Sequence, residues 1–152
     1  MQDPEYPAGR SCVGEMLTIT NSAAETRALG EQLASRLHPG DTVILEGELG
    51  AGKSELARGI AKGLGVTETV TSPSFTILNV YESGRCPLYH FDWYRLESEE
   101  ELYELGMEEY LGGDGVAVVE WAERCPDAVP EKCIRIRLEV TGEETRRIEI
   151  NE

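Results

Sequence analysis

The spacing of apolar and polar residues along the chain predicts strands and helices in alternation, an order typical of an α/β protein. Apolar residues recur with helical spacing in two stretches, and the first stretch opens with a capping box from Ser22 to Glu25. An acidic stretch that opens with a second capping box, from Ser98 to Glu101, predicts a third helix. The predicted helices span residues 22–37, 54–65 and 98–105. The predicted strands span residues 16–20, 42–47, 75–81, 86–92, 116–121, 133–140 and 145–150.

Two pairs of neighbouring strands predict antiparallel hairpins. Residues 75–81 and 86–92 flank the turn "ESGR", and residues 133–140 and 145–150 flank "TGEE". The central sheet should therefore be mixed and not purely parallel. Residues 1–15 mix prolines, glycines and charges without periodicity, which indicates a flexible extension or a cloning remnant.

Composition narrows the class of protein. The chain has 152 residues, the size of one domain, and a net charge of -15. That charge disfavours direct contact with DNA, an RNA backbone or an anionic membrane, so any RNA would be held by a basic partner. Cys12, Cys86, Cys125 and Cys133 lack the spacing of a zinc site, which indicates reduced thiols. With neither a secretory segment nor an apolar run long enough to cross a bilayer, we expect a soluble cytoplasmic protein.

A glycine-rich loop lies between the second strand and the second helix. In "GELGAGKS", Gly47, Gly52, Lys53 and Ser54 match the Walker A pattern G-x-x-x-x-G-K-[ST]. Backbone N–H groups of residues 49–54 would surround the β-phosphate, Lys53 would bridge the β- and γ-phosphates, and Ser54 would bind Mg²⁺. We expect residues 16–152 to be a single P-loop ATPase domain, a P-loop NTPase-like three-layer sandwich with a central mixed β-sheet. The predicted nucleotide-binding residues are Gly47, Glu48, Leu49, Gly50, Ala51, Gly52, Lys53, Ser54 and Glu55.

Hydrolysis requires a carboxylate near the end of a neighbouring strand, to hold Mg²⁺ and orient water. Asp92 follows "PLYHF" and Glu120 follows "VAVV", so each apolar run delivers one acid to a strand end. We expect both to face the nucleotide as metal ligands, and together with Lys53 they are the predicted catalytic residues. His90, two residues before Asp92 on one strand face, could orient that carboxylate or be structural. Trp121 could pack near the nucleotide, but it is interpreted as a partly buried core residue.

The motifs "GELGAGKS", "TSPSF", "YHFDWYRL" and "EWAE", in this order, resemble those of the TsaE (YjeE) family over residues 16–140. The family's ATPases serve bacterial tRNA threonylcarbamoyladenosine synthesis. The resemblance implies ATP and Mg²⁺ as cofactors. It also implies TsaB and TsaD as partners, which modify adenosine 37 of certain tRNAs. The protein would then contact tRNA only indirectly, through these partners. It also implies that Glu120 is the metal-site acid and Asp92 a second essential acid, either of which could activate water.

The resemblance further implies a switch-like loop beside the γ-phosphate, formed by Thr71, Ser72, Pro73, Ser74 and Phe75. Three hydroxyl groups around a proline of fixed φ could change contacts when the γ-phosphate leaves. Glu55 stands where the family commonly has a hydroxyl residue, and its charge would weaken nucleotide binding unless it points to solvent.

Other classes of protein fit the sequence less well. A GTPase needs N-K-x-D and D-x-x-G motifs, and neither occurs. A small-molecule kinase needs an acceptor pocket and an arginine-bearing lid, for which the chain offers scattered residues such as Arg58, Arg95 and Arg124. A nucleotide-gated binding module would differ from the expected ATPase only in that its hydrolysis is not coupled to the cycle of a partner. Because no arginine lies in an obvious finger loop, we expect slow hydrolysis by the isolated chain and activation by a partner.

Overall fold

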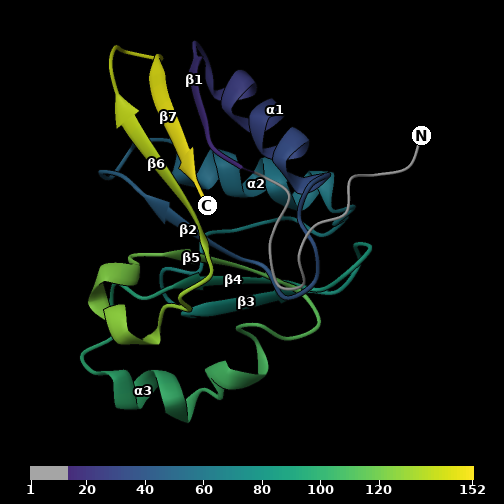
Figure 1. The fold of residues 1–152 in the computed structure, drawn as a ribbon, viewed down its shortest axis with the longest axis vertical. Coiled ribbons are helices and arrows are strands. Elements are labelled where there is room, and N and C mark those ends of the chain that lie inside the picture. The colour runs from purple at the N-terminus through teal and green to yellow at the C-terminus, as the bar shows by residue number, and fades with distance from the viewer. Residues whose placement is uncertain (1–13) are drawn as a thin grey trace.

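Seven strands form one mixed sheet in the order β1-β7-β6-β2-β5-β4-β3 (Figure 1). The computed structural model describes residues 14–152, so the predicted extension over residues 1–15 falls almost wholly outside the described residues. The strands are β1 (Met16–Thr20), β2 (Thr42–Glu46), β3 (Leu78–Tyr81), β4 (Leu88–Asp92), β5 (Val116–Glu120), β6 (Ile134–Val140) and β7 (Arg146–Asn151). β6, β2, β5 and β4 are parallel, whereas β3–β4, β6–β7 and β1–β7 pair antiparallel. Both predicted hairpins and the mixed sheet are confirmed.

The central strands are buried on both faces, as their nearly continuous apolar runs predict. Alternate side chains of β2 and β5 point to opposite faces and enter two separate cores. Val43, Leu45, Val116 and Val118 belong to one core, and Ile44, Ala117 and Val119 to the other.

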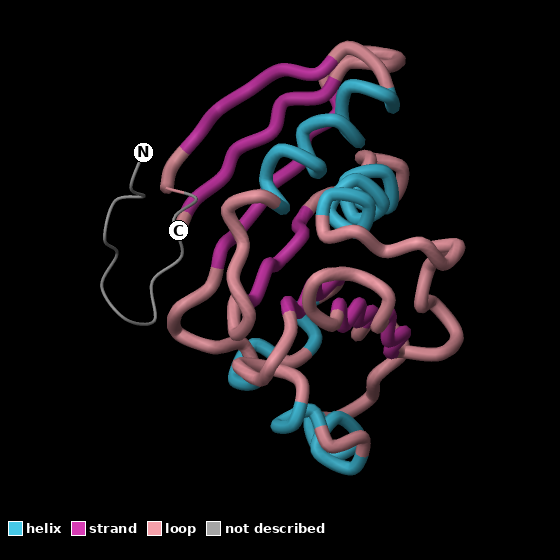
Figure 2. The backbone as a smooth tube through the Cα atoms, turned by 90° about the vertical axis from the view of Figure 1, so that its right-hand side faces the viewer, coloured by secondary structure: helices cyan, strands magenta, loops and turns pink. Residues whose placement is uncertain are grey.

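Two helices, α1 (Ala23–Ala34) and α2 (Lys53–Gly63), cover one face of the sheet and pack side by side (Figure 2). Ser22 caps α1 as predicted, since its Oγ accepts a hydrogen bond from the Glu25 N–H at 3.1 Å. The helices approach so closely that a Cβ atom on Gly59 would overlap the carbonyl oxygen of Arg27. This contact fixes α2, and with it the loop that leads into α2.

Short helices cover the opposite face and complete the predicted three layers (Figure 1). They are α3 (Glu99–Glu104) and three 3-10 helices, Met107–Glu109, Ala122–Arg124 and Pro126–Ala128. The predicted capping box at Ser98 is wrong, because the Ser98 side chain makes no capping bond and Glu101 accepts instead from the Glu97 N–H at 3.1 Å.

Eight predicted elements are longer than the observed ones, and in three of them the structure shows a local cause. The helix predicted over residues 22–37 ends at Ala34, because Arg36 and Leu37 donate to carbonyls three residues back and so tighten its last turn. The strand predicted over residues 75–81 begins only at Leu78, since Ile77 has a positive φ of 68°. The strand predicted over residues 116–121 ends at Glu120 because Trp121, with φ 61°, is also left-handed.

Two expectations from composition can be compared with the described residues. Cys86, Cys125 and Cys133 are free thiols, whereas Cys12 lies outside the described part of the chain. None of the helices in residues 14–152 has the length and apolar character that crossing a membrane requires.

Candidate functional site

The glycine-rich loop of residues 47–52 joins β2 to α2 in the strand, loop and helix order predicted for a phosphate-binding loop. Because its sequence predicts phosphate binding, it is called the phosphate loop. Gly52 is the N-cap of α2, so Lys53 and Ser54 occupy the first turn, where free N–H groups and the helix dipole favour an anion. Gly47 has φ 153°, and a Cβ atom there would lie 2.7 Å from the carbonyl oxygen of Leu138. Only glycine fits at this position, where the loop begins.

The Lys53 side chain is buried against an aromatic ring. Its Nζ atom lies 4.2 Å from the ring centroid of Trp121. Trp121 also packs on Tyr94, with ring centroids 4.9 Å apart, and lines the cavity described below. Trp121 is partly buried, as interpreted, but it belongs to neither core and lines the cavity, because the chain turns to the left-handed region directly after β5.

The two predicted carboxylates lie at the carboxyl ends of neighbouring parallel strands. Asp92 ends β4, Glu120 ends β5, and the two residues are partners in the strand register. Both are buried and belong to the sheet face that α2 covers, as the alternation along β4 and β5 requires. The sheet thus brings both acids to the side of the phosphate loop.

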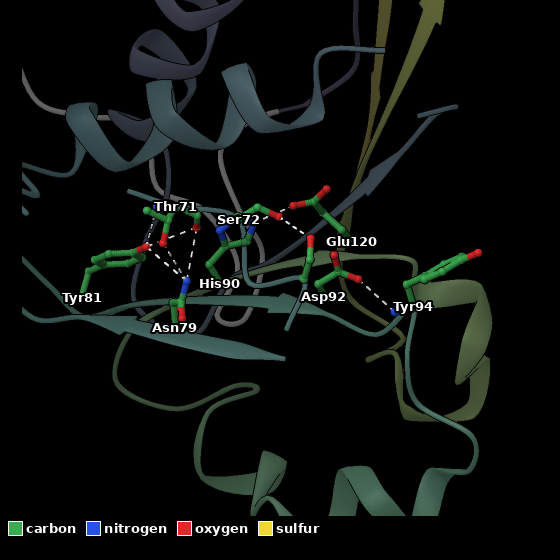
Figure 3. A network of polar contacts seen from close by, with 9 residues as sticks. Thr71, Ser72, Asn79, Tyr81, His90, Asp92, Tyr94 and Glu120 are labelled. Atoms are coloured by element: carbon green, nitrogen blue, oxygen red, sulfur yellow. Dashed lines mark hydrogen bonds and ion pairs between the residues drawn. The ribbon is translucent and has the colours of Figure 1, made fainter. Parts of the chain in front are cut away.

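His90 contacts Glu120 and not Asp92 (Figure 3). Its Nε2 atom lies 2.7 Å from Glu120 Oε2, and both side chains are almost fully buried. The sequence left two roles open for His90, orientation of Asp92, its neighbour two residues along the strand, or a structural role. The correction is that the contact runs between strands, from β4 to β5.

Asp92 has a different environment. Its Oδ1 atom accepts a hydrogen bond from the Tyr94 N–H at 2.9 Å (Figure 3). Burial raises the pKa of the Asp92 carboxyl above its usual range, and the charge of Glu120 adds to the rise. The Tyr94 hydrogen bond, His90 and Lys53 oppose it. Two acids that face one loop are therefore held by different partners.

A cavity of about 600 Å³ joins these parts into one site. Ten of the predicted site residues line it, namely Leu49, Gly50, Gly52, Lys53, Ser54, Glu55, Ser72, Ser74, Asp92 and Glu120. Six others do not, namely Gly47, Glu48, Ala51, Thr71, Pro73 and Phe75. The walls hold two acids, a lysine, a hydroxyl at a helix start and loop backbone, which suit a polyphosphate with a divalent cation.

The predicted switch loop reaches the cavity through its serines. Ser72 Oγ and Ser74 Oγ are 2.7 Å apart. Thr71 instead faces β3, where its N–H donates to the Tyr81 hydroxyl at 3.1 Å and its carbonyl accepts from Asn79 (Figure 3). Hydrogen bonds therefore hold the Thr71 end of the loop on β3, while Ser72 and Ser74 line the cavity.

Glu55 does not leave an unbalanced charge beside the phosphate loop. Its carboxylate pairs with Arg27 of α1 at 3.0 Å and with Arg58 at 2.7 Å. These ion pairs offset the negative charge that the sequence placed in the first turn of α2.

Tyr94 and Arg95 also line the cavity. The sequence predicted no role for Tyr94, and Arg95 was named only as a scattered arginine of the kinase alternative. The guanidinium of Arg95 lies 4.4 Å from the ring centroid of Phe75, a switch-loop residue that is 82% exposed. The available signal was position, since the two residues come two and three positions after Asp92, the last residue of β4.

Comparisons with known proteins show the family and a similar fold. The family profile of "Threonylcarbamoyl adenosine biosynthesis protein TsaE" matches residues 20–148. The chain is 43% identical over 129 residues to the Bacillus subtilis tRNA threonylcarbamoyladenosine biosynthesis protein TsaE, covering 85% of this chain and 80% of that protein. It is 42% identical over 135 residues to the Treponema pallidum protein of the same name, covering 89% and 99%. The crystal structure of Bacillus subtilis YdiB superposes with a TM-score of 0.78 at 38% identity, covering 91% of this chain and 85% of that one. The chain therefore belongs to the TsaE family.

Proposed function

We propose that this protein binds and hydrolyses Mg-ATP in the cytoplasm, in support of tRNA threonylcarbamoyladenosine formation at adenosine 37 by a TsaB–TsaD complex. One observation carries the ATPase proposal: Lys53, Asp92 and Glu120 line a single cavity at the start of α2. The tRNA role is supported by membership of the TsaE family and by the names of its relatives.

The residues of the site divide the work of phosphate binding. The first turn of α2 offers its N–H groups to the β-phosphate, and Lys53 exchanges the Trp121 ring for the β- and γ-phosphate oxygens. ATP would displace only a ring contact, because Lys53 forms no ion pair among the described residues.

The donors present fit Mg²⁺. No group of three or more His, Cys, Asp or Glu side chains able to hold a metal occurs within residues 14–152. The site offers two carboxylates and the Ser54 hydroxyl, which suit an ion that keeps several waters and takes further oxygens from phosphate. When bound, Mg²⁺ neutralises charge that develops on the phosphate oxygens. The His90 hydrogen bond holds Glu120, and the Tyr94 N–H holds Asp92, so either acid is positioned to orient the attacking water.

A second cation is available in the same cavity. The sequence offered no arginine in an obvious finger loop, but Arg95 lies in the cavity wall on Phe75 of the switch loop. Arg95 is exposed and must leave the ring before it can reach a phosphate, which fits slow turnover by the isolated chain. In this proposal the TsaB–TsaD complex accelerates the reaction, by supplying an arginine or by ordering Arg95.

The acidic surface of α3 supports electrostatic attraction to a basic partner. Glu99, Glu100 and Glu101 occupy its first turn and Glu104 its last residue, while Glu108 and Glu109 follow in a 3-10 helix. Gly106, with φ 74°, separates the last two acids from α3.

The test is phosphate release from Mg-ATP by the isolated chain and by the chain titrated with TsaB–TsaD, at low and high salt. We expect slow release alone, faster release with the complex, and tighter association at low salt. No release under any condition would sink the ATPase proposal. Phosphate release without stimulation by TsaB–TsaD would contradict activation by a partner. Stimulation that does not change with salt concentration would show that α3 is not part of the interface.

A further inference from the structure

Arg146, the first residue of β7, contacts the phosphate loop from outside the cavity that holds the acids. Its Nε atom donates to the carbonyl oxygen of Ala51 at 3.1 Å, and its Nη2 atom donates to that of Gly50 at 3.2 Å. Its Nη1 atom lies 2.9 to 3.5 Å from three carbonyl oxygens of the β6–β7 turn, those of Gly142, Glu143 and Thr145. One side chain therefore joins the turn to the loop.

These contacts fix the orientation of two peptide groups. The carbonyl and N–H of one peptide point in opposite directions, because the peptide is planar and trans. The Ala51 carbonyl shares its peptide with the Gly52 N–H, so holding that carbonyl on Arg146 directs the Gly52 N–H to the other side. The peptide between Gly50 and Ala51 is held at both ends, since the Ala51 N–H also donates to the Glu48 carbonyl at 2.9 Å. Glycine-rich peptides are otherwise free to flip.

The neighbouring arginine offers a matched comparison. Arg147 is the next residue of β7, so its side chain points to the opposite face of the sheet. There it pairs with Glu139 at 3.5 Å and Glu149 at 3.8 Å, and it lines neither the 600 Å³ cavity nor a second cavity beside the phosphate loop. Arg146, by contrast, lines this second cavity of about 270 Å³, together with Gly50 and Gly52.

We infer that Arg146 is a positioning residue of the nucleotide site, which holds the phosphate loop in its binding conformation through the carbonyl oxygens of Gly50 and Ala51. This inference rests on the proposed function, since it assumes that the loop binds ATP phosphates. Its guanidinium supplies charge-assisted hydrogen bonds without entering the place of the phosphates. In this arrangement Lys53 and the backbone N–H groups of the loop contact the phosphates, and Arg146 does not.

The test compares Arg146→Gln, Arg146→Lys and Arg147→Gln with the wild type. The dissociation constants of Mg-ADP and Mg-ATP are measured by calorimetry, KM and kcat by phosphate release, and loop mobility by amide hydrogen exchange without nucleotide. Arg146→Gln should raise both dissociation constants by about ten- to a hundredfold, because both nucleotides place the β-phosphate in the loop. It should raise KM more than it lowers kcat, and hydrogen exchange in residues 50–53 should quicken.

Arg146→Lys should recover part of the affinity, because a lysine keeps the charge but lacks the fork that reaches two carbonyls. Arg147→Gln should bind as the wild type does. Wild-type affinity and exchange in Arg146→Gln would overturn the inference while leaving the ATPase proposal intact. An equal loss of affinity in Arg147→Gln would show that the hairpin acts only through general stability. Failure of the wild type to bind either nucleotide would overturn the proposed function and this inference together.

Discussion

The Nζ atom of Lys53 lies 4.2 Å from the ring centroid of Trp121, directly after the strand that ends in Glu120. The ammonium therefore already lies among the acids and the loop before any nucleotide binds. Cation–π attraction of about 0.5–2 kcal/mol holds the ammonium there. This attraction is weak enough for a phosphate to displace the ring. The contact also places the Trp121 indole in the cavity wall beside Lys53.

Lys53→Ala should abolish stabilisation by Mg-ATP. The wild type should gain about 2.7 kcal/mol at a nucleotide concentration one hundred times Kd, and the variant almost none. The nucleotide-free variant should lose about 0.5–2 kcal/mol of stability, because it lacks the Trp121 contact. Thermal melts with and without Mg-ATP measure both effects. A melting-temperature increase equal to that of the wild type would refute the role of Lys53.

Asp92→Asn and Glu120→Gln keep the shapes of the side chains and remove their charges. Phosphate release at saturating Mg-ATP should fall by about a hundredfold or more in each, whereas ATP affinity should change less. Glu123→Gln is the control, because Glu123 is exposed in the next turn and does not line the 600 Å³ cavity. A wild-type rate in either acid variant would exclude that residue from catalysis.

Arg95→Ala should lower kcat by about tenfold or more if Arg95 is the second cation, with little change in Mg-ADP affinity. Arg124→Ala provides the comparison, since its guanidinium also lies over a ring, 5.0 Å from the centroid of Tyr94, but outside the residues that line the 600 Å³ cavity. Single-turnover phosphate release separates the two variants. Equal rates in both would assign the second cation to a partner.

Tyr89 should make stability depend on alkaline pH. Burial and a hydrogen bond to Asp114 Oδ1 at 2.5 Å raise the pKa of its hydroxyl to about 12. The unfolded chain ionises this tyrosine near pH 10, so its contribution is complete below pH 10 and is lost as pH rises toward 12. Urea unfolding between pH 9 and 12 should show a steeper loss for the wild type than for Tyr89→Phe. Parallel curves would contradict the assignment.

The sequence predicted the parts of the site that depend on local order. The phosphate loop between β2 and α2 follows from glycine spacing, and Asp92 and Glu120 follow from the apolar runs before them. The contacts of Arg146 and the partner of His90 could not be predicted, because they join segments far apart in the chain. The left-handed turns at Ile77 and Trp121 were also missed, since bulky residues rarely adopt a positive φ and carry no turn signal.

The contact of Arg146 with the phosphate loop also has a consequence for protein synthesis, which proceeds from the N-terminus to the C-terminus. Gly50 and Ala51 precede Arg146 by 96 and 95 residues, so a ribosome synthesises the loop long before the side chain that holds it. A nascent chain that has completed β2 and α2 carries the whole phosphate-binding motif without its support. If the inference about Arg146 holds, such a chain has only weak affinity for nucleotide, and tight binding begins after β7 has been added to the sheet.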